Sequence, residues 1–329
     1  MKTTSDNIDY ETLKAPIEKE FHEFMDALED TIGNCPEDIK KMMPFSDAYR
    51  GKKIRPVTML LFAKSCGNIT QTHIKLAVVI EIIHTATLMH DDVLDESEIR
   101  RKKNTINATW GNQRGILLGD YFFATAFSLL EGLDTSLPIE LANLTKTISI
   151  GEIMQVENQH NYSLTEKKYI DIIEKKTATL FEAAASMGAR FAGRKDMESI
   201  SNAFGKKFGT AYQIVDDLLD LGGNEQKVGK TLGTDIKQGK ITLPVIHMLE
   251  NAEPDTKECL LALLEKAKND RDMEKDIRDM LTDFGSMGYA KKIALTLLED
   301  AKKAIEPLPS CMTKNSLFAL ADYSASRCF

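Results

Sequence analysis

The chain has 329 residues and a formal charge of −8, and 43% of its residues are hydrophobic, with only 19 glycines and 9 prolines. This composition supplies a large buried core and excludes extensive disorder and long linkers. The acidic balance disfavours a nucleic-acid surface, so any anionic ligand must be held by a local positive cluster. Five scattered cysteines without a CxxC pair predict free thiols rather than a disulfide framework or a zinc ribbon.

The sequence contains no recognisable membrane or export signal. Its apolar stretches are far shorter than the roughly 18 to 20 residues that span a bilayer. Residues 1–21 mix charges with isolated apolar positions, and Cys328 lies second from the end rather than fourth, where prenylation needs it. We therefore expect no integral membrane segment and a cytoplasmic location.

Helix-period patterns dominate the chain, and strands are hard to find. Helices are predicted, in chain order, at about residues 8–30, 55–67, 74–89, 115–132, 138–158, 165–192, 204–220, 240–250, 255–267, 271–284, 286–304 and 314–325. Segment 74–89 is apolar almost all the way round, which is typical of a central helix in a bundle. The breaks between segments are too short for domain linkers. The pattern predicts one all-α domain over residues 1–329.

Two of these apolar helices end in the pattern DDxxD, as DDVLD at residues 91–95 and DDLLD at residues 216–220. On a helix the first and last aspartates lie one turn apart on the same face, so the carboxylates converge. Convergent carboxylates repel unless a cation lies between them, and Mg²⁺, a hard ion that prefers oxygen ligands, fits best. One such motif is equally well explained as a solvated acidic helix end, but two inside apolar helices favour a metal site.

Polar side chains lead into both acidic motifs. His84 and Thr87 precede the first motif, and Gln213 precedes the second. Polar groups inside an apolar helix cost free energy unless they are satisfied, so these positions indicate a wet, functional cavity.

Basic residues flank the acidic motifs. GKKIRP at residues 51–56 precedes the first apolar helix, RRKK at residues 100–103 follows the first motif, and a glycine-rich basic segment at residues 229–240 follows the second. Arg and Lys suit phosphate oxygens, although the last segment lacks the spacing of a P-loop. Each basic run alone is typical of a solvated face. Together with metal-binding carboxylates they predict a site for a diphosphate.

The ordered motifs resemble the trans-isoprenyl diphosphate synthase (polyprenyl synthetase) family over nearly the whole chain, especially its medium- and long-chain members. Besides the motifs above, the matching segments are HTATLMHDDVLDESEIRR at 84–101, GD at 119–120, GEIMQ at 151–155, KKTATLF at 175–181, GTAYQIVDDLLD at 209–220 and GKTLGTDIKQGKITLP at 229–244. The resemblance implies a homodimeric isoprenoid synthase bundle with a central cavity and about three Mg²⁺. It also implies a prenyltransferase that condenses isopentenyl diphosphate with an allylic diphosphate, extending a trans-polyprenyl chain.

The resemblance also assigns roles to individual positions. It makes Asp91, Asp92, Asp95 and Asp216 metal ligands, with Asp217 and Asp220 supporting them or binding through water. It places Lys52, Arg55, His84 and Arg101 in the isopentenyl diphosphate pocket. It directs Arg100, Lys176, Lys230 and Lys240 to the allylic diphosphate, and it lines the reacting end with Thr177, Gln155 and Gln213.

The chain departs from the family pattern at two places. Lys102-Lys103-Asn104 follows Arg101 where the family commonly has glycine and then proline, and Lys53 replaces a usual arginine. Both acidic motifs are intact, which disfavours a catalytically dead subunit.

Product length in the family often depends on the positions four and five before the first motif, here Thr87 and Ala86. Neither is bulky, so we expect a product longer than C15, in the C30–C40 range, and a shorter product after Ala86→Phe. Phe122, Phe123, Phe127 or Leu130 provide an alternative, deeper floor for the tunnel. The remaining alternatives are a geranylgeranyl or farnesyl diphosphate synthase and a non-catalytic regulatory subunit of a heteromeric synthase. A class I terpene cyclase is disfavoured because its second metal motif has an Asn/Ser/Glu pattern.

Overall fold

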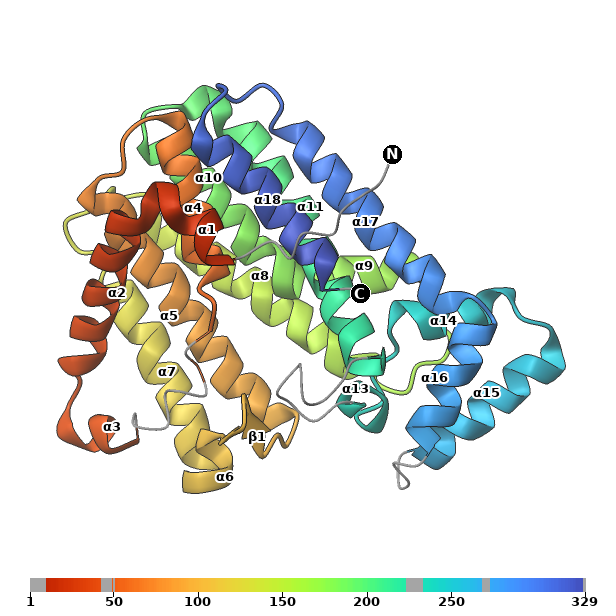
Figure 1. The fold of residues 1–329 in the computed structure, drawn as a ribbon. Coiled ribbons are helices and arrows are strands. Elements are labelled where there is room, and N and C mark those ends of the chain that lie inside the picture. The colour runs from red at the N-terminus through yellow and green to blue at the C-terminus, as the bar shows by residue number, and fades with distance from the viewer. Residues whose placement is uncertain (1–9, 43–48, 50, 223–232, 268–272, 328–329) are drawn as a thin grey trace.

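The computed structural model describes residues 10–42, 49, 51–222, 233–267 and 273–327, and these form packed helices (Figure 1). The α-helices are α1 (Tyr10–Lys14), α2 (Glu18–Gly33), α3 (Glu37–Met42), α4 (Ile54–Cys66), α5 (Gln71–Leu94), α6 (Ile106–Trp110), α7 (Asn112–Ser128), α8 (Leu137–Glu157), α9 (Glu166–Ile173), α10 (Thr179–Phe191), α11 (Glu198–Gly222), α13 (Thr234–Lys237), α14 (Leu243–Asn251), α15 (Pro254–Ala267), α16 (Met273–Asp283), α17 (Ser286–Ala304) and α18 (Met312–Ser326). Short 3-10 turns are η1 (Ala15–Ile17) and η4 (Lys195–Met197). The all-α prediction is confirmed.

Strand structure in the described part of the chain is limited to β1 (Ile99–Arg100) and β2 (Lys103–Asn104), which pair antiparallel. The two residues between them, Arg101 and Lys102, have φ values of 49° and 64°. Positive φ at both central residues is the pattern of a type I′ hairpin turn, which glycine and asparagine normally occupy. The segment that departs from the family pattern is therefore a tight, strained hairpin beside the first acidic motif.

Helix α5 lies in the core and carries the first acidic motif at its C-terminal end. It begins with a capping box, in which the side chains of Thr70 and His73 each accept a hydrogen bond from the other residue's backbone N–H. Its length and hydropathy are sufficient to cross a membrane, but 67% of its apolar window is buried inside the protein. The apolar surface of α5 is thus used in packing against α2, α4, α7 and α10.

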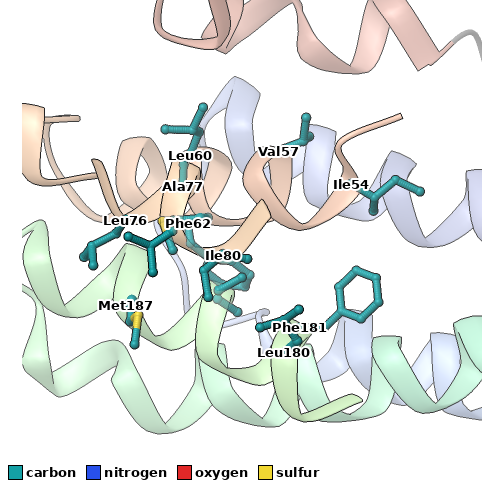
Figure 2. Packing of buried hydrophobic residues seen from close by; sticks show 14 of the residues in the cluster. Ile54, Val57, Leu60, Phe62, Leu76, Ala77, Ile80, Leu180, Phe181 and Met187 are labelled. Carbon is teal, nitrogen blue, oxygen red and sulfur yellow. The ribbon is translucent and has the colours of Figure 1, made fainter. Parts of the chain in front are cut away.

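Aromatic and aliphatic side chains fill the space between α4, α5 and α10. Figure 2 shows Phe62 of α4, Ile80 of α5 and Phe181 of α10 within this layer. Phe204 of α11 joins them with its ring centroid 5.2 Å from that of Phe62, and Phe208 lies 5.2 Å from Phe181. Each fully buried phenylalanine contributes about 1.5–3 kcal/mol, so this layer fixes the relative positions of the helices that carry both acidic motifs.

A second apolar cluster surrounds the C-terminal half of α11 and the helices α14, α15, α16 and α17. Ile214 and Leu218 of α11 belong to this cluster, whereas Phe204 and Phe208 belong to the first. Because one rigid helix is part of both clusters, the second acidic motif is supported by packing from two sides.

The segment predicted as one helix at residues 165–192 is interrupted by a π-helical turn, η3 (Glu174–Ala178), between α9 and α10. Neighbouring helices approach this π-turn through glycines. A Cβ on Gly151 of α8 would lie 2.5 Å from the backbone nitrogen of Lys176, and one on Gly209 of α11 would lie 2.6 Å from Cα of Ala178. Both glycines are needed for backbone contact with the π-turn, which presents Lys176 and Thr177.

Candidate active site

A cavity of about 380 Å³ lies where α5 and α11 approach their C-terminal ends. Asp91 of the first motif and Asp216 of the second both line it. Basic and polar residues share its wall, namely Arg55, His84, Arg100, Arg101, Lys176, Thr177 and Gln213. The two acidic motifs therefore face a common cavity, as the prediction of a metal-bridged diphosphate site requires.

The outer aspartates of the first motif each lie close to a lysine. Asp91 Oδ2 is 3.8 Å from Lys176 Nζ. Asp95 Oδ2 accepts a hydrogen bond of 2.9 Å from Lys240 Nζ, and the backbone oxygen of Asp95 accepts one of 2.7 Å from the amide of Gln238. The segment that follows the second acidic motif is thereby joined to the first motif.

The middle aspartate, Asp92, points away from this arrangement. Its side chain is buried, and Tyr49 Oη donates to Oδ2 at 2.8 Å while Arg100 Nη2 donates to Oδ1 at 2.7 Å. Burial raises the pKa of Asp92, and the adjacent Arg100 opposes that change. Both carboxylate oxygens are therefore engaged by protein donors, and Arg100 is held at the cavity wall.

The middle and last aspartates of the second motif, Asp217 and Asp220, are also held by hydrogen bonds. Tyr169 Oη donates to Asp217 Oδ2 at 2.5 Å, and Gln213 Nε2 donates to Asp217 Oδ1 at 2.8 Å. Burial raises the pKa of Asp217 to about 7. Asp220 accepts from the hydroxyl of Thr234 at 3.1 Å and from the backbone N–H of Asp235 at 3.0 Å. Asp220 thus anchors α13 against the end of α11.

Asp216, the cavity-lining aspartate of the second motif, pairs with the residue that follows the last helix, α18. Arg327 Nη2 donates to Asp216 Oδ1 at 2.7 Å, and the guanidinium lies 4.7 Å from the ring centroid of Tyr212. Its Nη1 is buried and makes no hydrogen bond within the described structure. No local pattern predicts this contact, because a single arginine just after a helix is ordinary.

The donor set fits magnesium. Among the described residues, no three His, Cys, Asp or Glu side chains gather closely enough to enclose a metal ion on their own. Mg²⁺ rarely needs such a cage, since it commonly binds one or two carboxylates and completes its shell with water and substrate phosphates. Asp91 and Asp216 present carboxylates to one cavity with cationic walls, which suits an ion bound together with a polyanion.

The predicted isopentenyl diphosphate pocket is assembled from separate segments. The Arg55 guanidinium lies 4.3 Å from the Phe181 ring centroid, and its buried Nε makes no hydrogen bond within the described residues. Arg101 packs against Gly51, where a Cβ would lie 2.5 Å from the guanidinium. Burial and then the charge of Arg55 lower the pKa of His84 well below 6.5, so this imidazole is neutral.

Lys52 and Lys53 lie on opposite sides of the same loop. Part of the Lys52 side chain is exposed, and its Nζ lies 4.6 Å from the Tyr323 ring centroid. Its partial burial, followed by the charges of Arg327 and Arg101, lowers the pKa of Lys52. Lys53 has φ 56°, and its side chain turns into the core to pair with Glu81 at 2.9 Å. The departure from the family pattern at position 53 is therefore a buried ion pair. Arg55 lines the cavity, whereas Lys52 is not among its lining residues.

The predicted reacting end is connected by hydrogen bonds. Thr177 Oγ1 donates to Gln213 Oε1 at 2.8 Å, and the Gln213 amide continues to Asp217. Gln155 lines a smaller adjoining cavity of about 90 Å³ that also includes Lys240. Lys230 lies outside the described residues.

One carboxylate at this site was not singled out from the sequence. Glu152 of α8 lines the larger cavity, and its Oε2 lies 2.5 Å from Lys176 Nζ. It belongs to the GEIMQ segment, where only the final glutamine had been assigned a role. The available sequence signal for Glu152 was its place directly after Gly151 in a predicted helix.

The predicted chain-length positions have different surroundings. Thr87 lines the cavity together with Leu88 and Phe123, whereas Ala86 is fully buried in the first core cluster. Of the alternative floor residues, Phe123 therefore reaches the cavity, and Phe122 is 1% exposed and belongs to the core.

The fold and site together define an all-α enzyme that handles diphosphates between two acidic helix ends. The polyprenyl synthetase family model matches residues 37–281. The octaprenyl diphosphate synthase of Escherichia coli is 34% identical over 84% of this chain and 86% of that protein, and a nonaprenyl diphosphate synthase of Rhodobacter capsulatus is 37% identical over 84% and 85%. The crystal structure of a Caulobacter crescentus polyprenyl synthase, complexed with calcium and isoprenyl diphosphate, matches with a TM-score of 0.92, 30% identity and coverage of 98% and 99%. The chain belongs to the polyprenyl synthetase family and is a trans-polyprenyl diphosphate synthase, a prenyltransferase.

Proposed function

We propose that this enzyme condenses isopentenyl diphosphate with an allylic diphosphate, head to tail, to give a trans-polyprenyl diphosphate in the C30–C40 range. The observation that carries the proposal is the common cavity, in which Asp91 and Asp216 face Arg55 and Arg101. The long-chain relatives support the product class, since the compared synthases from E. coli and R. capsulatus are named for octaprenyl and nonaprenyl products.

The cationic side chains divide between the two substrates in this proposal. Arg55, Arg101 and Lys52 bind isopentenyl diphosphate, and neutral His84 contributes a hydrogen bond. Lys176, Lys240, Arg100 and, from outside the described residues, Lys230 bind the allylic diphosphate. Bound Mg²⁺ supplies electrostatic neutralisation of the leaving diphosphate. Preorganised Lys and Arg donors add to that stabilisation without reorganising during the reaction.

The chemistry then needs orientation and exclusion of water. Loss of diphosphate leaves an allylic cation, which the isopentenyl double bond attacks before a proton passes to the released diphosphate. The dipoles of Thr177 and Gln213, with Gln155 in the adjoining smaller cavity, orient the reacting end, while Leu88, Phe123 and Ile148 form an apolar wall. That wall keeps water from quenching the cation to an alcohol.

Metal binding by the six aspartates, with about three Mg²⁺, stays a prediction. The position of Asp91 and Asp216 on the cavity supports direct ligation. The hydrogen bonds of Asp92, Asp217 and Asp220 support an orienting role in the described conformation, and direct ligation by Asp92 would require release of Arg100.

We further propose a cytoplasmic homodimer in which residues 1–329 form one catalytic domain. Exposed apolar side chains on α7 and α8 support a dimer contact, among them Leu117 at 66%, Ile139 at 70% and Ile153 at 57% exposure. Large exposed apolar patches mark interaction surfaces, and these side chains lie on two helices that are consecutive in the chain. The single-domain proposal is supported by α11, which is shared by both apolar clusters.

The test is a product assay with the purified protein, Mg²⁺, labelled isopentenyl diphosphate and farnesyl diphosphate as primer. Products of C30–C40, lost in Asp91→Asn and Asp216→Asn variants, are the expected result. Geranylgeranyl diphosphate as the sole product would reject the long-chain proposal. So would farnesyl diphosphate as the sole product in an assay that uses a shorter primer. Activity that appears only with an added partner would identify a regulatory subunit, and a monomer in light scattering would contradict the homodimer.

A further inference from the structure

We infer that Glu152 is a positioning residue that holds the Lys176 ammonium at the allylic diphosphate site, an inference that rests on the proposed function. Glu152 Oε2 lies 2.5 Å from Lys176 Nζ, and both side chains are 17% exposed. The same ammonium is 3.8 Å from Asp91 Oδ2. Lys176 is thus held between a cavity-wall carboxylate and the first aspartate of the acidic motif.

The backbone supports this arrangement. Gly151 precedes Glu152 on α8, and its missing side chain lets that helix contact the backbone of Lys176 in the π-turn. Two adjacent residues of α8 therefore set the place of Lys176, one through backbone contact and the other through its charge. π-turns inside helices frequently occur at functional sites because they project side chains that a regular helix would direct elsewhere.

The charges around Lys176 explain why a second carboxylate is useful. Asp91 and Glu152 attract the ammonium, Lys240 repels it, and Asp95 adds a weaker attraction. Without Glu152, the nearest anionic partner of Lys176 is Asp91. The ammonium would then move toward Asp91, where it would neutralise a predicted metal ligand and withdraw from the diphosphate. Glu152 keeps Lys176 available to the substrate and Asp91 open to a cation.

The decisive comparison is Glu152→Gln against Glu140→Gln. Glu140 lies on the same helix and pairs with Arg190 at 2.7 Å, away from the residues that line the cavity. Steady-state kinetics should show that Glu152→Gln raises the KM for the allylic diphosphate about tenfold while the KM for isopentenyl diphosphate stays within twofold. Glu152→Asp should raise the KM for the allylic diphosphate less than Glu152→Gln does, and Glu140→Gln should leave both KM values unchanged.

A merely structural role predicts a different pattern. If Glu152→Gln changes both KM values equally, or neither, while thermal unfolding shows a folded protein, the inference is wrong. Calorimetric titration with inorganic pyrophosphate and Mg²⁺ of the wild type, Glu152→Gln and Glu140→Gln separates failure of this inference from failure of the proposed function. A wild type without prenyl transfer would refute the proposed function. Pyrophosphate binding weakened about tenfold by Glu152→Gln alone would still support the placement of Lys176, and equal binding would overturn it.

Discussion

The buried pair of Lys53 and Glu81 predicts a large and specific loss of stability in Glu81→Gln. The two side chains are 7% and 3% exposed, and their charged atoms lie 2.9 Å apart. Removing one partner leaves an uncompensated buried charge, which costs about 3–5 kcal/mol. At about 2.1 cal/mol/K of unfolding entropy per residue, the whole chain has roughly 0.7 kcal/mol/K, so the Tm should fall by about 4–7 °C.

Differential scanning calorimetry of the purified variants measures this effect. Asp38→Asn is the matched control, because its pair with Lys41 spans 3.3 Å between side chains that are 94% and 63% exposed, and an exposed pair should shift the Tm by less than about 1 °C. A combined Lys53→Met and Glu81→Leu variant should regain most of the loss, since it removes both charges. A Tm for Glu81→Gln within about 1 °C of the wild type would refute the reasoning.

Further predictions concern side chains of α5, namely His73 near its start and Ala86 and Thr87 closer to the acidic motif. His73 Nδ1 accepts from the Thr70 N–H and Nε2 contacts the Gly188 carbonyl, and burial lowers its pKa below the usual 6.5. Below pH 6.5 the unfolded chain therefore binds a proton at His73 that the folded protein does not. The free energy of unfolding of the wild type should fall as the pH drops below 6.5, by at most about 1.4 kcal/mol per pH unit for this group. His73→Asn should show a shallower decline in thermal unfolding, and parallel curves would contradict this. Thr87→Phe should place a ring in the cavity and shorten the product, which chromatography measures; a product of unchanged length would assign the tunnel floor to other residues. Ala86→Phe forces a ring into the packed core, so it should lower the stability of the protein by about 1–3 kcal/mol and shorten the product less.

Hydrophobic periodicity was sufficient to predict the long helices, because each buries a continuous apolar face. The prediction at residues 74–89 correctly identified a core helix, which the structure extends to Gln71–Leu94 and through the acidic motif. The short helices α3, α6 and α13 were missed because one or two turns carry too little periodicity. The hairpin at Arg101 and Lys102 was missed because neither positive-φ position holds the glycine or asparagine that signals such a turn.

The site was predictable in its chemistry more than in its geometry. The family resemblance implied a central cavity, and in the structure Asp91 of the first acidic motif and Asp216 of the second line the same cavity. Helical spacing also suggested that three carboxylates converge in each motif, but Asp92 is drawn aside by Tyr49 and Arg100, which no local pattern reveals. The contact of Arg327 with Asp216 joins segments far apart in the chain, so only the tertiary structure identifies it.

The π-turn makes the length of the segment from α9 to α10 as important as its composition. Loss of one residue there would allow a regular α-helix to form with α9 and α10 facing nearly as before, because a π-turn holds one residue more than an α-turn over a similar rotation. The side chains within the turn would then point elsewhere, and Thr177 would lose its hydrogen bond to Gln213. Related sequences should therefore vary in residue type between α9 and α10, while selection removes insertions and deletions in this segment.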